Sequence, residues 1–230
     1  MGFNEKTHAF IAAKFYVHLT EHFGERGKQA FVHATRYYAE QRGRRMAQRA
    51  IRDGQPLNYE TYCRYGEWMG TEEIEKAGCS NQVTVTDWTP DYVMEIHRCP
   101  WHAQFREMGL KEAGMTYCRD LDASICRGFN PEMKYEVPQT LHDHDYCIQI
   151  VRNAGLKEGQ NITKRPEGIR SFEYHCAHSF WSYSEVSSAI FGAEGETVNL
   201  QVMEDFKEEY GEEMAGILAG YRHTNFNVCD

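Results

Sequence analysis

Apolar residues recur every three to four positions over the first part of the chain, through residues 5–24 and again through 26–52. This spacing places them along one side of a helix, so it predicts two amphipathic helices. Asn58 is a favourable N-cap for a short third helix that extends to about Trp68. We therefore expect residues 1–75 to form a helical N-terminal part.

Hydrophobic and polar residues alternate in four segments after residue 80. Alternation with a period of two is typical of half-buried strands. A helix over 111–127 separates the first two strands from the last two, and Gly128 and Pro131 end it. Two hairpins on either side of a helix predict a four-stranded antiparallel sheet with helices on one face. The strands are expected at about 83–85, 92–96, 133–140 and 145–152.

The helical period returns near the end of the chain, at 170–191 and again at 197–221, where Gly211 can interrupt the second helix. The predicted fold class is therefore α+β. It consists of the helical N-terminal part, a β-β-α-β-β core over 80–152, and two C-terminal helices within 170–222. We expect residues 1–230 to form a single domain, because a chain of this length buries roughly 70% of its unfolded surface.

The composition excludes several classes of protein. The formal net charge of −9 argues against a nucleic-acid partner, which would need a basic face. No apolar run approaches the length of a membrane span, and the start of the chain lacks the apolar core of a signal peptide. The eight cysteines form no CxxC pair, so they fit neither a zinc ribbon nor a secreted disulfide framework. We expect reduced thiols and a cytoplasmic location.

Candidate chemistry is concentrated on the predicted helix 111–127. Gly114, Cys118, Asp122 and Cys126 follow one another at spacings of four, so they share one face of this helix. An acid on a face of small and apolar residues needs a cation or a polar pocket, because burial of an unpaired carboxylate is costly. Cys118 and Asp122 are therefore candidate catalytic residues. A core cysteine beside an acid at the protein surface would produce the same pattern.

The strand after this helix carries a second candidate thiol. Tyr146, Ile148 and Ile150 alternate to one face of the strand, which leaves Cys147 and Gln149 on the other. A thiol and an amide opposite an apolar face indicate a pocket wall, although packing beneath a helix explains them equally well.

Two histidines lie in the turn before that strand. His142 and His144, at i and i+2, could converge on a cation. Aspartate and histidine are also common turn residues, and the spacing identifies no third ligand. We therefore predict no metal and no other cofactor.

Five arginines and no lysine occupy residues 42–52. Arg42, Arg45 and Arg49 fall on one side of a helix, where they could hold a carboxylate or phosphate group, or pair with acidic residues of the protein. Because arginine is preferred where a planar fork meets a carboxylate with reduced hydration, we expect Arg45, with Arg42 or Arg49, to face the interior.

Four sequence blocks occur in order along the chain: RGRRMAQRA, RCPWHAQFREMGLKEAGMTYC, DASICRGFNP, and a hairpin of the form QT…DYC. On these blocks the chain resembles the L-2-amino-thiazoline-4-carboxylic acid hydrolase family over most of residues 30–152. The resemblance implies hydrolytic opening of a small five-membered cyclic amidine that carries a carboxylate. It also implies that the family's cysteine and acid on the central helix correspond to Cys118 and Asp122, and its hairpin cysteine to Cys147. The family usually has Gly-Asp in the hairpin turn, where this chain has residues 142–145, HDHD, and this difference would change the mouth of the pocket.

The leading hypothesis is an enzyme that hydrolyses a C–N bond of a small heterocyclic substrate. Cys118 would attack the ring carbon, while Asp122 or a nearby histidine would transfer protons. Arg42, Arg45 and His142 would bind the substrate.

Other assignments stay open at this point. Cys99, at the start of a predicted helix, and Cys147 compete with Cys118 as the nucleophile. The same pocket would also suit a ligand-binding or sensor domain without chemistry, a class that distant similarity to vinyl-reductase-type domains also suggests. A third hypothesis is metal-assisted hydrolysis through His142 and His144. Assembly into a homo-oligomer is left open.

Overall fold

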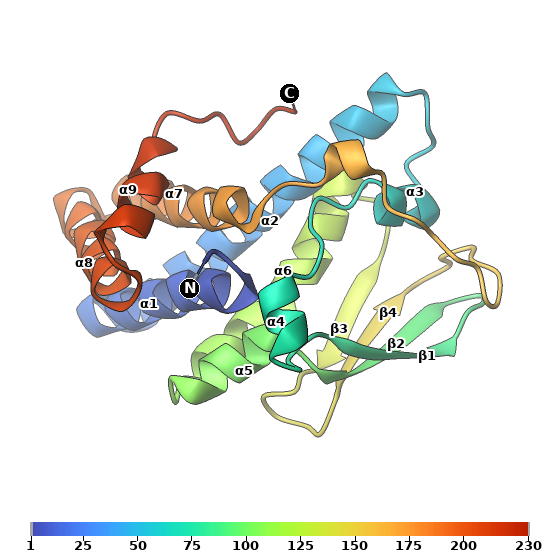
Figure 1. Cartoon of the computed structure of the whole chain (residues 1–230), viewed down its shortest axis with the longest axis horizontal. Coiled ribbons are helices and arrows are strands. Elements are labelled where there is room, and N and C mark those ends of the chain that lie inside the picture. The colour runs from blue at the N-terminus through green and yellow to red at the C-terminus, as the bar shows by residue number, and fades with distance from the viewer. Residues whose placement is uncertain (1, 230) are drawn as a thin grey trace.

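The computed structural model describes residues 2–229 and contains, within that range, nine α-helices and one four-stranded antiparallel sheet (Figure 1). Most of the helices gather on one side, and the sheet lies on the other. Helices α5 (Pro100–Glu107) and α6 (Lys111–Phe129) lie between the two hairpins in the chain. The α+β class and the arrangement of two hairpins around a central helix, both predicted from the sequence, are confirmed.

A helical hairpin opens the chain. Helix α1 (Glu5–Phe23) begins at Asn4, whose side chain accepts hydrogen bonds from two backbone amides of the first turn. The helix ends at Gly24, which has a φ of +56° and allows α2 (Glu25–Arg52) to start at once. Only glycine adopts this backbone conformation without strain, so the sharp reversal depends on it.

Helix α6 lies along α2, and two glycines set how closely the helices approach. A Cβ atom at Gly43 would lie 2.6 Å from the backbone nitrogen of Phe129, and one at Gly128 would lie 2.7 Å from the Cα of Glu40. Both distances are too short for any larger side chain. The backbones therefore touch, which fixes the position of the inward face of α6 against α2.

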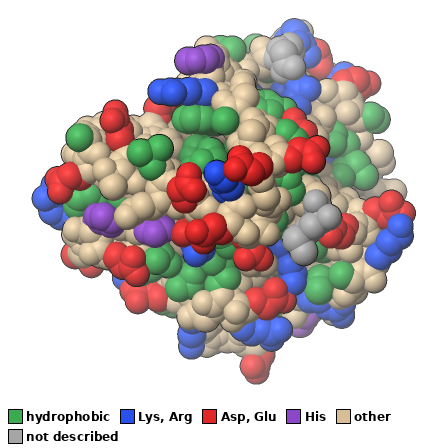
Figure 2. Space-filling model, turned by 60° about the vertical axis from the view of Figure 1, so that its left-hand side comes forward, with side chains coloured by type: hydrophobic (Ala, Val, Ile, Leu, Met, Phe, Trp, Pro, Cys, Tyr) green, Lys and Arg blue, Asp and Glu red, His purple; other side chains and the backbone are tan. Residues whose placement is uncertain are grey.

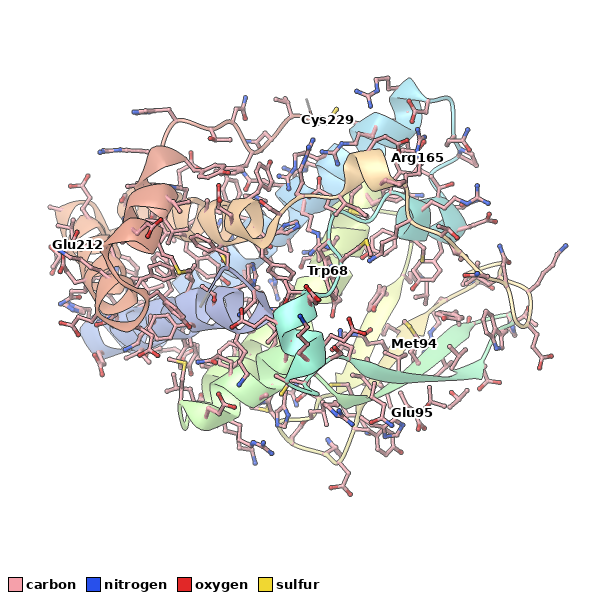
Figure 3. All side chains as sticks on the ribbon, in the orientation of Figure 1. Trp68, Met94, Glu95, Arg165, Glu212 and Cys229 are labelled. Atoms are coloured by element: carbon pink, nitrogen blue, oxygen red, sulfur yellow. The ribbon has the colours of Figure 1, made fainter. Side chains whose placement is uncertain are left out.

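The sheet has the order β1-β2-β4-β3, with every neighbouring pair antiparallel. Its strands are β1 (Gln82–Asp87), β2 (Tyr92–Arg98), β3 (Tyr135–Gln139) and β4 (Cys147–Val151). The register pairs Met94 with Gln149 and Ile96 with Cys147. Because side chains alternate along a strand, these four residues share the sheet face that looks toward α6. Figure 3 shows Met94 and Glu95 on opposite sides of β2.

Three helices complete the helical layer: α7 (Phe172–Phe191), α8 (Ala193–Tyr210) and α9 (Glu212–Gly220). The last predicted helix is thus divided at Gly211, whose φ is +89°. The main core forms where α7 and α8 meet α1 and α2, and its aromatic residues include Phe15, Phe31 and Tyr183.

The connection between α2 and β1 differs from the prediction. Helix α3 (Tyr59–Arg64) ends before Trp68, and the sequence pattern did not indicate the short helix α4 (Glu72–Lys76). The backbone of Arg64 accepts a hydrogen bond from the amide of Arg165, and the backbone of Glu67 accepts one from Arg170. The segment after α3 is therefore held by the loop that precedes α7, next to the short 3-10 helix η1 (Pro166–Gly168).

The surface face in Figure 2 carries acidic and basic side chains interspersed with hydrophobic ones, without a continuous basic patch on that face. None of the helices within residues 2–229 combines the length and apolar character that crossing a membrane would require.

Candidate active site

The structure brings together the three residues predicted to be catalytic. Cys118 and Asp122 project from α6 toward the sheet, and Cys147 begins strand β4 opposite them. Gln149, two residues along the same strand face, donates a 2.8 Å hydrogen bond from Nε2 to Asp122 Oδ2. Tyr135 of β3 in turn donates to Gln149 Oε1 at 2.6 Å. The candidate site therefore lies between α6 and the inner face of the sheet.

These side chains line the protein interior without being sealed off. Cys118, Asp122, Tyr135, Cys147 and Gln149 are each half-buried, whereas neighbouring positions of α6 are fully buried. Asp122 Oδ1 accepts no hydrogen bond from residues 2–229, so only one oxygen of this carboxylate is engaged. The residues that carry the acid and the thiol are therefore partly accessible to solvent.

Asp122 is held in an environment that penalises its charge. Burial raises the pKa of the Asp122 carboxyl, while the Arg42 guanidinium and the hydrogen bond from Gln149 oppose that rise. The negative charge of Asp122 also raises the pKa values of two nearby tyrosines, Tyr62 and Tyr135, whose largest cause is burial. The Asp122 carboxylate would therefore be stabilised by a further cationic partner.

Three thiols surround this acid. Burial raises the pKa of Cys99 to about 12 and that of Cys147 to about 11, and it raises the pKa of Cys118 well above the ordinary value. Cys118 is close enough to Cys99, Cys147 and Asp122 for each of them to raise its pKa further. At neutral pH all three are protonated thiols, so the nucleophile among them needs a base when it attacks.

Within residues 2–229, the thiol of Cys118 is the one that has a base in contact with it. His142 Nε2 lies 3.6 Å from Cys118 Sγ, within hydrogen-bonding range for sulfur. Burial is the largest cause that lowers the pKa of His142 to about 4, and the neighbouring His102 contributes. The imidazole is therefore neutral at pH 7, and in the tautomer with the proton on Nδ1 its Nε2 accepts a hydrogen bond from the thiol. The Sγ of Cys147 instead accepts a hydrogen bond from the Leu141 amide at 3.1 Å, and no base among residues 2–229 contacts it.

Gly114 makes this pair possible. A Cβ atom at that position would lie 2.5 Å from His142 Nε2, so the ring occupies the space that any larger side chain would fill. The ring is also in edge-to-face contact with His102 and Phe105 of α5. The sequence contained one signal for this contact, since Gly114 precedes Cys118 by one helical turn. Nothing in the sequence linked either residue to a histidine in the hairpin turn.

The two turn histidines have different surroundings. His142 is buried against α6, whereas His144 is 51% exposed and its Nδ1 lies 3.3 Å from Asp143 Oδ1. Asp143 is anchored by the backbone amide and hydroxyl of Thr140 and by Arg119, and hydrogen bonding lowers its pKa against the effect of burial. Within residues 2–229, no group of three or more histidine, cysteine or acidic side chains is arranged to hold a metal ion.

The predicted inward orientation of the arginines is confirmed, and the structure divides their roles. Arg45 is completely buried, and its Nε and Nη2 donate to the two oxygens of Glu67 at 3.1 and 2.6 Å. Its Nη1 donates to the carbonyl of Phe226. Arg49 pairs with Glu67 as well, at 2.6 Å. The hydrogen-bond donors of Arg45 are thus occupied within the protein, which leaves no open contact for a substrate.

Arg42 is different. It is only 8% exposed, yet its guanidinium forms no hydrogen bond or ion pair with residues 2–229, and its Nε is enclosed without a partner. It lies close enough to Asp122 to lower the pKa of that carboxyl. Of the two arginines predicted to bind substrate, Arg42 is the one whose hydrogen-bond donors are not engaged by residues 2–229.

Comparison with known proteins adds a family assignment. The sequence profile of the L-2-amino-thiazoline-4-carboxylic acid hydrolase family matches residues 4–150, which is more than half of the chain and includes Arg42, Cys118, Asp122, His142 and Cys147. No curated protein and no solved structure gives a significant match. The matched segment covers α1 through β4, and thus both walls of the candidate site. The chain therefore belongs to the L-2-amino-thiazoline-4-carboxylic acid hydrolase family.

Proposed function

We propose that this protein is a hydrolase that opens a small, carboxylate-bearing cyclic amidine through a covalent adduct on Cys118. The observation that carries the proposal is the contact of 3.6 Å between Cys118 Sγ and His142 Nε2, one helical turn from a carboxylate with a free oxygen. The family assignment supports the hydrolase class and a thiazoline-type substrate.

Substrate binding would prepare the thiol for attack. A protonated cyclic amidine presents N–H groups that match the free oxygen of Asp122. Its positive charge would offset the negative charge of Asp122, which is one cause of the raised pKa of Cys118. The thiol therefore becomes more acidic when the substrate is in place. Asp122 would orient and polarise the amidine, while the proton transfers are carried by His142.

Ring opening would proceed by addition and elimination. Cys118 Sγ bonds to the amidine carbon while its proton passes to His142 Nε2, and the carbon becomes tetrahedral. Protonated His142 is a strong acid, because burial favours its neutral form, and it gives that proton to the ring nitrogen. The ring C–N bond then breaks and a primary amine leaves. The carbon, which keeps its exocyclic nitrogen, remains bonded to Cys118.

Water would complete the cycle. His142 takes a proton from a water molecule as the water oxygen bonds to the same carbon. The C–S bond to Cys118 breaks, and the departing thiolate regains its proton from His142. The net reaction adds one water molecule across the ring C–N bond, and the thiol and imidazole return to their starting states.

The test is turnover of 2-amino-thiazoline-4-carboxylate by the wild-type protein and by three cysteine variants. Cys118→Ser should lose activity by at least 100-fold, because a serine hydroxyl is a far poorer nucleophile beside this base. Cys99→Ser and Cys147→Ser, which remove thiols that lack a base, should keep activity within a few-fold. Acid quenching during turnover, followed by mass spectrometry, should find the substrate carbon on the peptide that contains Cys118.

Two results would overturn this function. Near-normal turnover by a folded Cys118→Ser variant would exclude covalent catalysis at that residue. Saturable binding of the compound to the wild-type protein without any turnover would instead favour a ligand-binding domain that uses the same site.

A further inference from the structure

We propose that Lys164 and Arg42 together form the subsite that receives the substrate's carboxylate. The loop that carries Lys164 lies beyond the segment matched by the family profile, so this loop would select for an anionic substrate. The inference rests on the proposed function, and it names the residue that distinguishes a charged substrate from a neutral one.

Lys164 is placed in the interior by contacts with the segment that follows α3. Its Nζ donates a 2.7 Å hydrogen bond to the carbonyl of Trp68 and lies 4.8 Å from the centre of the Trp68 ring. The side chain is half-buried. Among residues 2–229, no carboxylate lies within ion-pair distance of Nζ, so the charge is met only by a carbonyl dipole and an aromatic face.

The loop holds Lys164 in this position. The backbone amide of the next residue, Arg165, bonds to the carbonyl of Arg64, and the Arg165 side chain pairs with Asp53. Trp68 and Arg165 are both labelled in Figure 3, where Trp68 lies on the same side of the sheet as Met94. Lys164 thus lies on a segment fixed at several points, and its direction is set by the fold.

Arg42 and Lys164 both lie toward the segment after α3: Lys164 Nζ donates to the carbonyl of Trp68, and Arg45, about one turn after Arg42 on α2, pairs with the adjacent Glu67. The Arg42 charge is the second cause, after burial, that lowers the pKa of Lys164, to about 8. Two cations at reduced exposure, with no ion-pair partner for either within residues 2–229, are unfavourable unless an anion joins them. Arg42 also has Glu67 in its surroundings, but both oxygens of Glu67 are engaged by Arg45 and Arg49.

Unused hydrogen-bonding capacity is also found on Arg42 and on the nearby His175. His175 is 2% exposed, and its Nε2 contacts the carbonyl of Glu67 at 3.1 Å, which requires the proton to be on Nε2. Its Nδ1 is therefore an acceptor, and it is buried without a partner. Arg42 Nε, a buried donor, is also without one, and the Arg42 charge lowers the pKa of His175. Of the two atoms, the Arg42 Nε donor is the one that a carboxylate, which only accepts hydrogen bonds, would satisfy.

The charges form a pattern that matches a zwitterionic substrate. Arg42 precedes Gly43, which packs against the backbone of Ile125, about one helical turn after Asp122 on α6. Consistent with this packing, the Arg42 charge acts on both Asp122 and Lys164. If the two cations hold the carboxylate, the amidinium end of the same small molecule would point toward Asp122. Cys118 lies one helical turn from Asp122 on the same face. Anion binding at this subsite therefore directs the amidine carbon toward the thiol.

The experiment measures binding in the Cys118→Ser background, so that hydrolysis does not interfere. The probes are 2-amino-thiazoline-4-carboxylate and the corresponding 4-carboxamide, and the method is isothermal titration calorimetry. Lys164→Met should weaken carboxylate binding at least 10-fold and leave carboxamide binding unchanged within about 2-fold. Lys164→Arg, which keeps the charge, should recover most of the loss. Lys157→Met removes an exposed lysine of the same loop and should have no effect on either probe.

Two measurements, the probe preference of Lys164→Met and the turnover of the wild-type protein, together separate this inference from the proposed function. Lys164→Met overturns the subsite if it weakens both probes equally or neither of them, provided that its melting temperature is close to that of the parent. If the carboxylate preference depends on Lys164 as expected but the wild-type protein shows no turnover, the subsite stands and the hydrolase function fails. If turnover occurs and the preference does not depend on Lys164, the function stands and the subsite fails.

Discussion

Replacement of Gly114 by alanine tests the Cys118–His142 pair without removing either residue. The new Cβ would lie 2.5 Å from His142 Nε2 and 2.8 Å from Nδ1. Non-bonded heavy atoms approach one another to roughly 3.5 Å, so the ring would have to move by about 1 Å. The Nε2–Sγ contact, now 3.6 Å, would then be lost or misaligned.

The expected effect on rate is large and the effect on stability is small. Misplacement of a catalytic group by 1 Å costs on the order of 100-fold in rate, so we expect kcat of Gly114→Ala to fall by about that factor. Overpacking costs about 1–3 kcal/mol. The higher helix propensity of alanine relative to glycine offsets up to about 1 kcal/mol of this cost. The variant should therefore remain folded.

The assay combines kcat for 2-amino-thiazoline-4-carboxylate with the free energy of unfolding in urea. Gly216→Ala on α9 is the matched control, because a Cβ atom there meets nothing within 4 Å. This control should keep full activity and gain slightly in stability. If Gly114→Ala is folded and its kcat stays within about threefold of wild type, the position of His142 has no part in catalysis and the proposed base is wrong.

Three further predictions concern the charges of the interior. Asp122→Asn should raise KM for the amidine by at least 10-fold while circular dichroism stays unchanged; an unaltered KM would remove Asp122 from substrate binding. Glu67→Gln should reduce the free energy of unfolding in urea by about 3–5 kcal/mol, because it removes the carboxylate that pairs with the fully buried Arg45 guanidinium; a loss below about 1 kcal/mol would contradict this. His142 and three other buried histidines (His8, His175 and His178) have pKa values lowered by burial, so the folded state binds fewer protons than the unfolded state below the unfolded pKa of about 6.5. Stability should therefore fall from pH 7.5 to 5.5 by about 1.4 kcal/mol for each histidine that stays neutral, and equal stability at the two pH values would refute it.

Most of the helices and strands, and the grouping of the candidate site residues on one helix face, were predictable from the amino-acid sequence. Alternation of apolar and polar positions depends only on local geometry, so the strands around Ile96 and Ile148 were predictable. The spacing of four between Cys118 and Asp122 placed them on one face of α6 for the same reason. The preference for arginine over lysine in α2 also predicted that this side of the helix faces inward, and the structure confirms it.

Contacts between residues distant in the chain were decided only by the tertiary structure. Arg42 and Arg45 lie three residues apart, yet Glu67 reaches Arg45 and leaves Arg42 open. His142 lies in a polar turn that resembled a metal site, and it became the partner of Cys118 because Gly114 leaves room for its ring. Lys164 reaches the carbonyl of Trp68 because the loop before α7 pairs with the segment after α3. The burial of a side chain, its ion-pair partner and its pKa depend on which residues contact it across the interior. Local periodicity in the sequence does not predict those long-range contacts.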